Sequence, residues 1–93
     1  MDQPLRAPEA KKLLRKILDG GEVTYSQPHA IERMRERGIS LADCLNVMRA
    51  GVMQEAQLEN GGWRHRIETA KIVVVVEFLS DDEVLVVTTW RKS

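Results

Sequence analysis

The period of the apolar residues changes near residue 51, and this change limits the folds open to the chain. Before it, apolar residues recur every three or four positions in three segments, which is typical of amphipathic helices. After it the period is two, and the run KIVVVVEFL at residues 71–79 is β-branched and apolar on both faces, as in a central strand. Helices followed by strands predict an α+β fold, and we expect residues 1–93 to form a single domain.

Capping and stop residues mark the ends of the three helices. The first is expected over residues 8–19, with a proline at its start and two glycines after it. Ser26 can cap the second helix, which ends at Gly38. The sequence SLAD at residues 40–43 resembles a capping box and begins the third helix, which Gly51 ends.

The second half of the chain reads as strands joined by turns. We expect an antiparallel sheet of three to four strands, with two to three helices packed on one of its faces. Because the central strand is apolar on both faces, the other face needs a cover as well, from sheet curvature, the chain ends or a partner. The expected strands are residues 52–58, 63–69, 71–79 and 84–90, and a short extended segment at 22–25 precedes them.

Charge and cysteine content exclude several classes of protein. The chain has 14 basic and 14 acidic residues, so a site for nucleic acid must be local and cannot rest on net charge. One cysteine permits no internal disulfide, and no apolar segment is long enough for a signal peptide or a membrane span. His29, Cys44 and His65 show no metal-ligand spacing. We expect a cytoplasmic protein without a metal, a cofactor or a membrane association.

A stripe of cationic side chains follows the second helix. His29, Arg33 and Arg37 are four residues apart and project to nearly the same side of a helix. Two guanidinium groups can grip a phosphate, and an imidazole can transfer a proton near neutral pH. The alternative is a solvated helix face on which these arginines pair with Glu32 and Glu36.

A second group of cations lies on the predicted strands. Arg64 and Arg66 share one strand face, and Trp90 is followed by Arg91 and Lys92. Cations beside an aromatic ring suit RNA, because charge follows the phosphates and the ring stacks on a base. The alternative is that Arg64 and Arg66 form cross-strand pairs with carboxylates. The acidic residues available for such pairs are Glu55, Glu59, Glu68 and Glu77.

Residues 26–40 carry the pattern S-x-P-H-A-x-x-R-M-x-x-R-G-I-S, and GGEV at residues 20–23 precedes it. This layout resembles a group of small bacterial domains that are similar to the RelE/MqsR-type toxins of toxin–antitoxin modules. The resemblance implies a RelE/MqsR-like fold, a metal-free endoribonuclease activity and inhibition by an antitoxin protein. It places Arg91 where these toxins carry a catalytic lysine. Their central-strand tyrosine falls within residues 74–76 here, and Arg64 replaces their glutamine.

The resulting hypothesis is a toxin that cleaves RNA by attack of the 2′-hydroxyl on the adjacent phosphorus. The catalytic candidates are His29 and His65 for proton transfer and Arg33 and Arg91 for the phosphate. The candidates for binding RNA are Arg37, Arg64, Arg66, Trp90 and Lys92. The alternative is a non-catalytic, protein- or RNA-binding regulatory domain of the same fold. A DNA-binding role is less favoured, because no helix-turn-helix pattern with an exposed basic helix is evident.

Overall fold

The computed structural model describes residues 4–92 and has helices in its first half and mainly strands in its second. This order confirms the α+β class and the three predicted helices. The elements are α1 (Ala7–Gly20), β1 (Glu22–Tyr25), α2 (His29–Arg37), α3 (Leu41–Ala50), β2 (Val52–Met53), β3 (Gln57–Glu59), β4 (Gly62–Glu68), β5 (Ile72–Phe78) and β6 (Glu83–Arg91). No helix within this part of the chain is both long and apolar enough to cross a membrane.

The sheet is larger than the sequence predicted, and it is mixed. Its strand order is β1-β6-β5-β4-β2, and β3 pairs with the other end of β4. The strands β4, β5 and β6 are antiparallel neighbours, but β1 joins β6 in parallel. The prediction of a purely antiparallel sheet of three to four strands is therefore wrong. The reason is that β1 pairs with a strand 61 positions further along the chain, from Glu22 to Glu83, and apolar periodicity does not report such pairings.

The single strand predicted over residues 52–58 is broken in two. Met53 lies opposite Ile67, and Gln57 lies opposite Arg64, so residues 54–56 face only residues 65–66. One extra residue on one strand is the signature of a β-bulge, which bends the strand and interrupts its ladder. The Gln54 carbonyl lies in this break, and it accepts a hydrogen bond from the ring of His65 at 3.0 Å.

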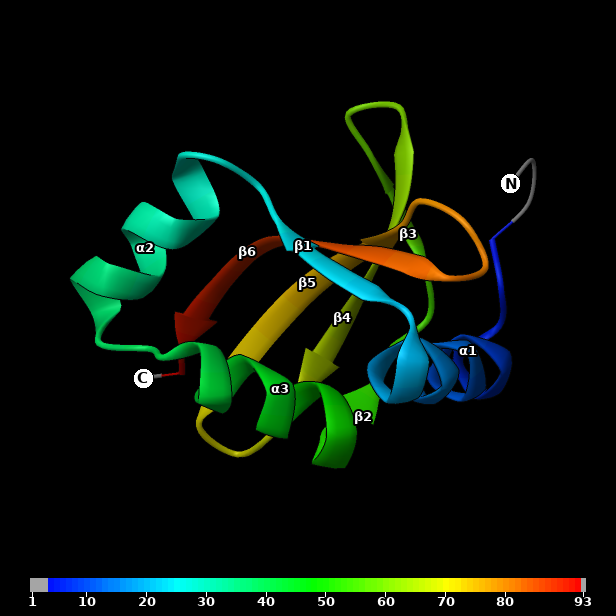
Figure 1. The fold of residues 1–93 in the computed structure, drawn as a ribbon, viewed down its shortest axis with the longest axis horizontal. Helices are drawn as coiled ribbons and strands as arrows, with labels where there is room; N and C mark the ends of the chain where they lie inside the picture. Colours follow the sequence, from blue (N-terminus) through cyan, green and yellow to red (C-terminus); the bar gives the residue numbers. More distant parts are fainter. Residues whose placement is uncertain (1–3, 93) are drawn as a thin grey trace.

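Two helices cover one face of the sheet, and the third lies beside it. Figure 1 shows α1 and α3 in front of the sheet, while α2 lies next to the end of β6. The whole chain has only four aromatic residues of the types Trp, Tyr and Phe, and the core between α1, α3 and the sheet is aliphatic. Its fully buried members include Leu14, Ile17, Met48, Ile67, Val74 and Val86.

The helix ends agree with the sequence at one helix and differ at another. The capping box of α3 is confirmed: the Ser40 hydroxyl accepts from the Asp43 N–H at 3.0 Å, and the Asp43 carboxylate accepts from the Ser40 N–H at 2.9 Å. These hydrogen bonds from Ser40 lower the pKa of Asp43. The predicted side-chain cap of α2 by Ser26 is wrong, because α2 begins at His29 without a side-chain cap. The Ser26 carbonyl instead accepts from the Ala30 N–H at 2.8 Å.

Candidate nucleic-acid interface

The face of the sheet opposite α1 and α3 carries side chains of β4, β5 and β6 and is not covered by a helix. Side chains alternate along a strand, so Arg64 and Arg66 lie on this face while the buried His65 and Ile67 point to the helices. We call this surface the open face. Its residues are Arg64, Arg66, Glu68, Val73, Val75, Glu77, Leu85, Thr88 and Trp90.

Long side chains cover the apolar centre of the open face. The guanidinium carbon of Arg66 lies 5.5 Å from the centre of the Trp90 ring. Arg66 lies opposite Val75 of β5, and Trp90 lies opposite Val73, so the two side chains meet across β5. Val73 and Val75 are each only 3% exposed. The aliphatic stem of an arginine can bury apolar surface in this way while its charge stays in water.

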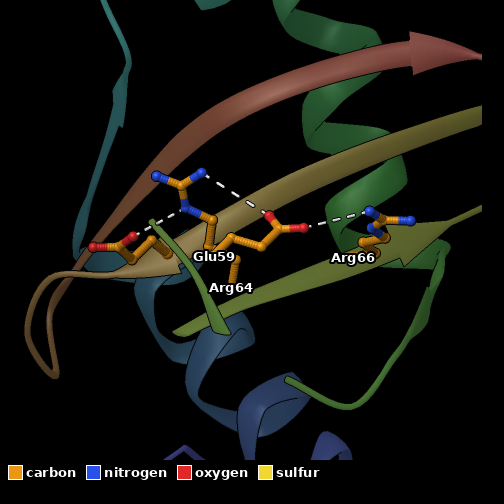
Figure 2. Close-up of polar contacts among 4 residues, drawn as sticks. Glu59, Arg64 and Arg66 are labelled. Atoms are coloured by element: carbon orange, nitrogen blue, oxygen red, sulfur yellow. Dashed lines mark hydrogen bonds and ion pairs between the residues drawn. The ribbon is translucent and has the colours of Figure 1, made fainter. Parts of the chain in front are cut away.

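Carboxylates neutralise the arginines of the open face. Figure 2 shows Glu59 between Arg64 and Arg66, with nitrogen–oxygen distances of 3.9 and 3.4 Å. Arg64 also pairs with Glu77 at 3.2 Å. At the other end of the face, Lys92 Nζ lies 2.8 Å from a Glu68 oxygen. Both Arg64 and Arg66 thus pair with carboxylates of neighbouring strands, as the second interpretation of their charges predicted.

A different arrangement holds the end of α2 against β6. Arg37 Nη1 donates to the Thr89 carbonyl at 2.6 Å, on a part of β6 that extends beyond β1. In the other direction, Arg91 donates from Nε to the Arg37 carbonyl at 2.9 Å and from Nη2 to the Gly38 carbonyl at 2.7 Å. Gly38 has the left-handed φ of 65° that commonly ends a helix. Arg91 therefore satisfies carbonyls that the helix itself leaves without partners.

The cations in this region form no ion pair within residues 4–92, but Arg91 lies near enough to Asp43 for its charge to lower the pKa of that carboxyl. We define the α2–β6 corner as His29, Arg33, Arg37 and Arg91. None of these residues forms an ion pair in the described part of the chain, and Glu32 and Glu36 form none either. Pairing with the helix glutamates, the alternative for this stripe, is therefore not seen. His29 and Arg33 are exposed, and Arg37 is half-buried against the sheet.

His65 lies apart from both the open face and the α2–β6 corner. It is 2% exposed, its Nδ1 contacts the Gln54 carbonyl, and its ring meets Phe78 edge-on at 5.7 Å between centres. Since it points to the helix side of β4, it does not share a surface with Arg64 or Arg66. Its neighbour Trp63 is half-buried on the same side of the strand.

The predicted site residues thus form three groups. His29, Arg33, Arg37 and Arg91 belong to the α2–β6 corner. Arg64, Arg66 and Trp90 lie on the open face, with Lys92 at its margin. His65 is alone on the helix side. The spacing of four residues predicted that the stripe lies on one side of a helix, and an α-helix does form over His29–Arg37.

Cys44 and Lys11 have structural environments. The Cys44 side chain is fully buried in the core, and burial raises the pKa of its thiol to about 11. Lys11 Nζ donates to the carbonyls of Met48 and Gly51, at 2.9 and 2.8 Å, and so caps the end of α3. The sequence alone does not indicate this role, because it depends on the packing of α1 against the end of α3. In residues 4–92, no three His, Cys, Asp or Glu side chains are grouped to hold a metal ion.

The fold and these surfaces define a small α+β domain with a mixed sheet, one open sheet face and a cationic corner. Residues 25–91 match the family described as "Domain of unknown function (DUF4258)", and the chain belongs to this family. The match begins at the last residue of β1 and ends at Arg91, so it includes α2, α3 and the strands β2 to β6. Neither the curated proteins nor the solved structures contain a significant match to the chain.

Proposed function

We propose that this chain is an RNA-binding domain of the RelE/MqsR-like toxin type, and that the α2–β6 corner contacts the RNA phosphates. The observation that carries the proposal is which arginines form ion pairs with carboxylates and which do not. Arg33, Arg37 and Arg91 form no ion pair within residues 4–92, whereas the arginines of the open face are paired. A phosphate therefore gains more at the corner, because it does not have to displace a carboxylate first.

Hydrogen bonding also prepares the corner for an anion. Arg37 and Arg91 are held by main-chain carbonyls, which fix each guanidinium without neutralising its charge. A guanidinium has five N–H donors, and these contacts use one donor of Arg37 and two of Arg91. The remaining donors and the exposed Arg33 supply a local patch that needs no net positive charge on the protein. An antitoxin as partner and the cytoplasm as location belong to the same proposal.

A pair of variants on one helix tests the site. Arg33→Ala should weaken binding of single-stranded RNA and reduce the salt dependence of log K by about 0.7, the value for one phosphate contact. Arg35→Ala is the matched control, because Arg35 is equally exposed but lies two positions further along, about 200° around the helix. Fluorescence anisotropy over a series of salt concentrations measures both. Equal losses in the two variants would contradict a site at the corner.

RNA cleavage is the second candidate, and it rests on His29. This exposed histidine lies one helical turn from Arg33, so a proton-transfer group and a phosphate ligand are adjacent. In the proposed reaction a base takes the proton of the 2′-hydroxyl, the oxygen attacks phosphorus, and an acid protonates the leaving 5′-oxygen. Arginines stabilise the additional negative charge. His65 is left out, because it lies on the helix side of β4.

Expression in bacteria and an RNA substrate test this candidate. Wild type should arrest growth and cleave RNA but leave an all-deoxy strand intact, since DNA lacks the attacking group. His29→Ala should lower the cleavage rate by about 10²-fold or more and relieve the arrest, while the fold is unchanged by circular dichroism. RNA binding without cleavage or growth arrest would favour the non-catalytic regulatory domain.

A further inference from the structure

A cavity of about 370 Å³ lies between the start of α3, the turn that joins β4 to β5, and the end of β6. Asp43, Asn46 and Val47 line it from one face of α3, and Arg91 lines it from β6. Figure 1 shows the start of α3 and the end of β6 at the same end of the sheet. The volume is within the range of small-molecule sites, about 300–1,000 Å³, and it has room for one nucleoside.

Arg91 connects this cavity to the α2–β6 corner, because its side chain belongs to both. Its Nε and Nη2 donate to the carbonyls of Arg37 and Gly38, so Nη1 keeps its two hydrogens for a phosphate. Lys71 adds a second cation from the β4–β5 turn, and it forms no ion pair within residues 4–92. A nucleotide whose phosphate is bound at Arg91 can therefore place its sugar in the cavity.

Hydrogen bonds hold the β4–β5 turn and so fix one wall of the cavity. Thr69 Oγ1 accepts from the N–H groups of Ile72 and Lys71, at 3.1 and 3.3 Å. The Lys92 N–H donates to the Lys71 carbonyl at 2.8 Å and ties the turn to the end of β6. Since the Thr69 hydroxyl is engaged within the turn, the side-chain acceptors open to a ligand are those of α3.

Asp43 places a carboxylate among these cations. The Ser40 N–H donates to its Oδ2 at 2.9 Å, and a carboxylate has about four lone-pair sites, so it can accept from a ligand as well. The hydrogen bonds from Ser40, and to a smaller extent the charge of Arg91, lower the pKa of Asp43, so the group is ionised at neutral pH. An ionised carboxylate repels phosphates but is a strong acceptor for a hydroxyl hydrogen. Ribose offers such a hydroxyl at its 2′ position, and deoxyribose does not.

We propose that this cavity receives the ribose of an RNA nucleotide whose phosphate is bound at Arg91, and that Asp43 accepts a hydrogen bond from its 2′-hydroxyl. The inference rests on the proposed RNA binding at the α2–β6 corner, and it adds a group that distinguishes RNA from DNA.

Fluorescence anisotropy at one low salt concentration compares short homopolymers of uridine, 2′-deoxyuridine and 2′-fluorouridine. The RNA strand should bind about 10-fold more tightly than the deoxy strand, the value of one hydrogen bond to a charged group. The 2′-fluoro strand keeps the sugar pucker of RNA but has no hydrogen to donate, so it should bind as weakly as the deoxy strand. Equal binding of the RNA and deoxy strands, or of the RNA and 2′-fluoro strands, would overturn the proposal. This comparison needs no variant, so it holds even if a substitution at Asp43 prevents folding.

A pair of variants assigns the acceptor. Asp43→Asn keeps one oxygen for the Ser40 N–H but removes the charge, and it should reduce the preference for RNA to about 3-fold. Glu36→Gln is the matched control, because it removes one negative charge from an exposed position on α2 outside the cavity and should leave the preference unchanged. An unchanged preference in Asp43→Asn, or an equal loss in the control, would refute the role of Asp43.

Failure of this subsite and failure of the proposed function give different results. If wild type binds neither RNA nor DNA, the proposed function is wrong and the subsite is wrong with it. If both strands bind equally and Arg33→Ala weakens both, the α2–β6 corner binds phosphates and only the ribose subsite is refuted.

Discussion

At the scale of the residue, arginines with the same charge have different tasks in this protein. Arg66 places its guanidinium over the Trp90 ring on the open face. Arg91 ends a strand and caps a helix that precedes it by more than 50 residues. Sequence spacing distinguishes neither task, because both depend on which elements meet in space.

Replacing Arg91 should therefore destabilise the fold as well as alter any site. Arg91→Ala loses two hydrogen bonds to helix carbonyls, and we expect the free energy of unfolding to fall by about 1–2 kcal/mol. Urea denaturation measures this loss. Lys92→Ala is the control, since it removes one partly exposed ion pair worth about 0–1 kcal/mol. If the two variants are equally stable, the cap contributes nothing and Arg91 is free for another role.

At the scale of the element, the start of α3 shows how local sequence can settle local structure. Ser40 and Asp43 are three residues apart and satisfy each other's backbone N–H groups, so the capping box could be predicted from four residues. The break between β2 and β3 shows the opposite case. Its extra residue is defined only against β4, and no feature of residues 52–58 alone reveals it.

The capping box predicts a dependence of stability on pH. The folded pKa of Asp43 lies below its ordinary value of 3.8, because Ser40 donates to the carboxylate. A depressed pKa stabilises the fold above 3.8, and this stabilisation is lost as the pH falls through the folded pKa. Asp43→Asn should show a flatter decline in the free energy of unfolding below pH 3.8 than wild type. Parallel curves would mean that the capping carboxylate is not coupled to folding.

At the scale of the whole molecule, charge balance is uneven. The net charge of zero conceals an open face on which acids and bases form ion pairs and a corner whose cations form none within residues 4–92. Glu59 is the centre of the neutral network, because it pairs with two arginines at once. Glu59 therefore weakens the binding of anions to the arginines of the open face.

Removing this carboxylate should strengthen such binding. Glu59→Gln keeps the shape of the side chain and releases the charge of Arg66, while Arg64 keeps its pair with Glu77, so single-stranded RNA should bind more tightly. The salt dependence of log K should steepen by about 0.7 for each new phosphate contact. Glu9→Gln on α1 makes the same change in net charge at an exposed position and should have a smaller effect. An identical gain in both variants would indicate that only net charge matters.

The sequence supported the fold class, the three helices, the capping box and the common side of the helix stripe, because each depends on residues close together in the chain. It did not support the parallel pairing of β1, the broken second strand or the separation of His65 from Arg64. The cavity beside Trp63 was also missed, since its lining comes from residues 4–5, 61–63, 65 and 77–79. These features arise only when distant segments pack, and no local pattern carries them.

The position of β6 has a consequence for the way in which the protein is made. This strand is the last of the described elements, yet it lies inside the sheet between β1 and β5. A nascent chain that has not yet released β6 cannot pair β1 with anything, and α2 lacks the strand against which it packs. Folding must therefore await the end of the domain's synthesis, and until then the valine-rich β5 has one unpaired edge that chaperones or other nascent chains can meet.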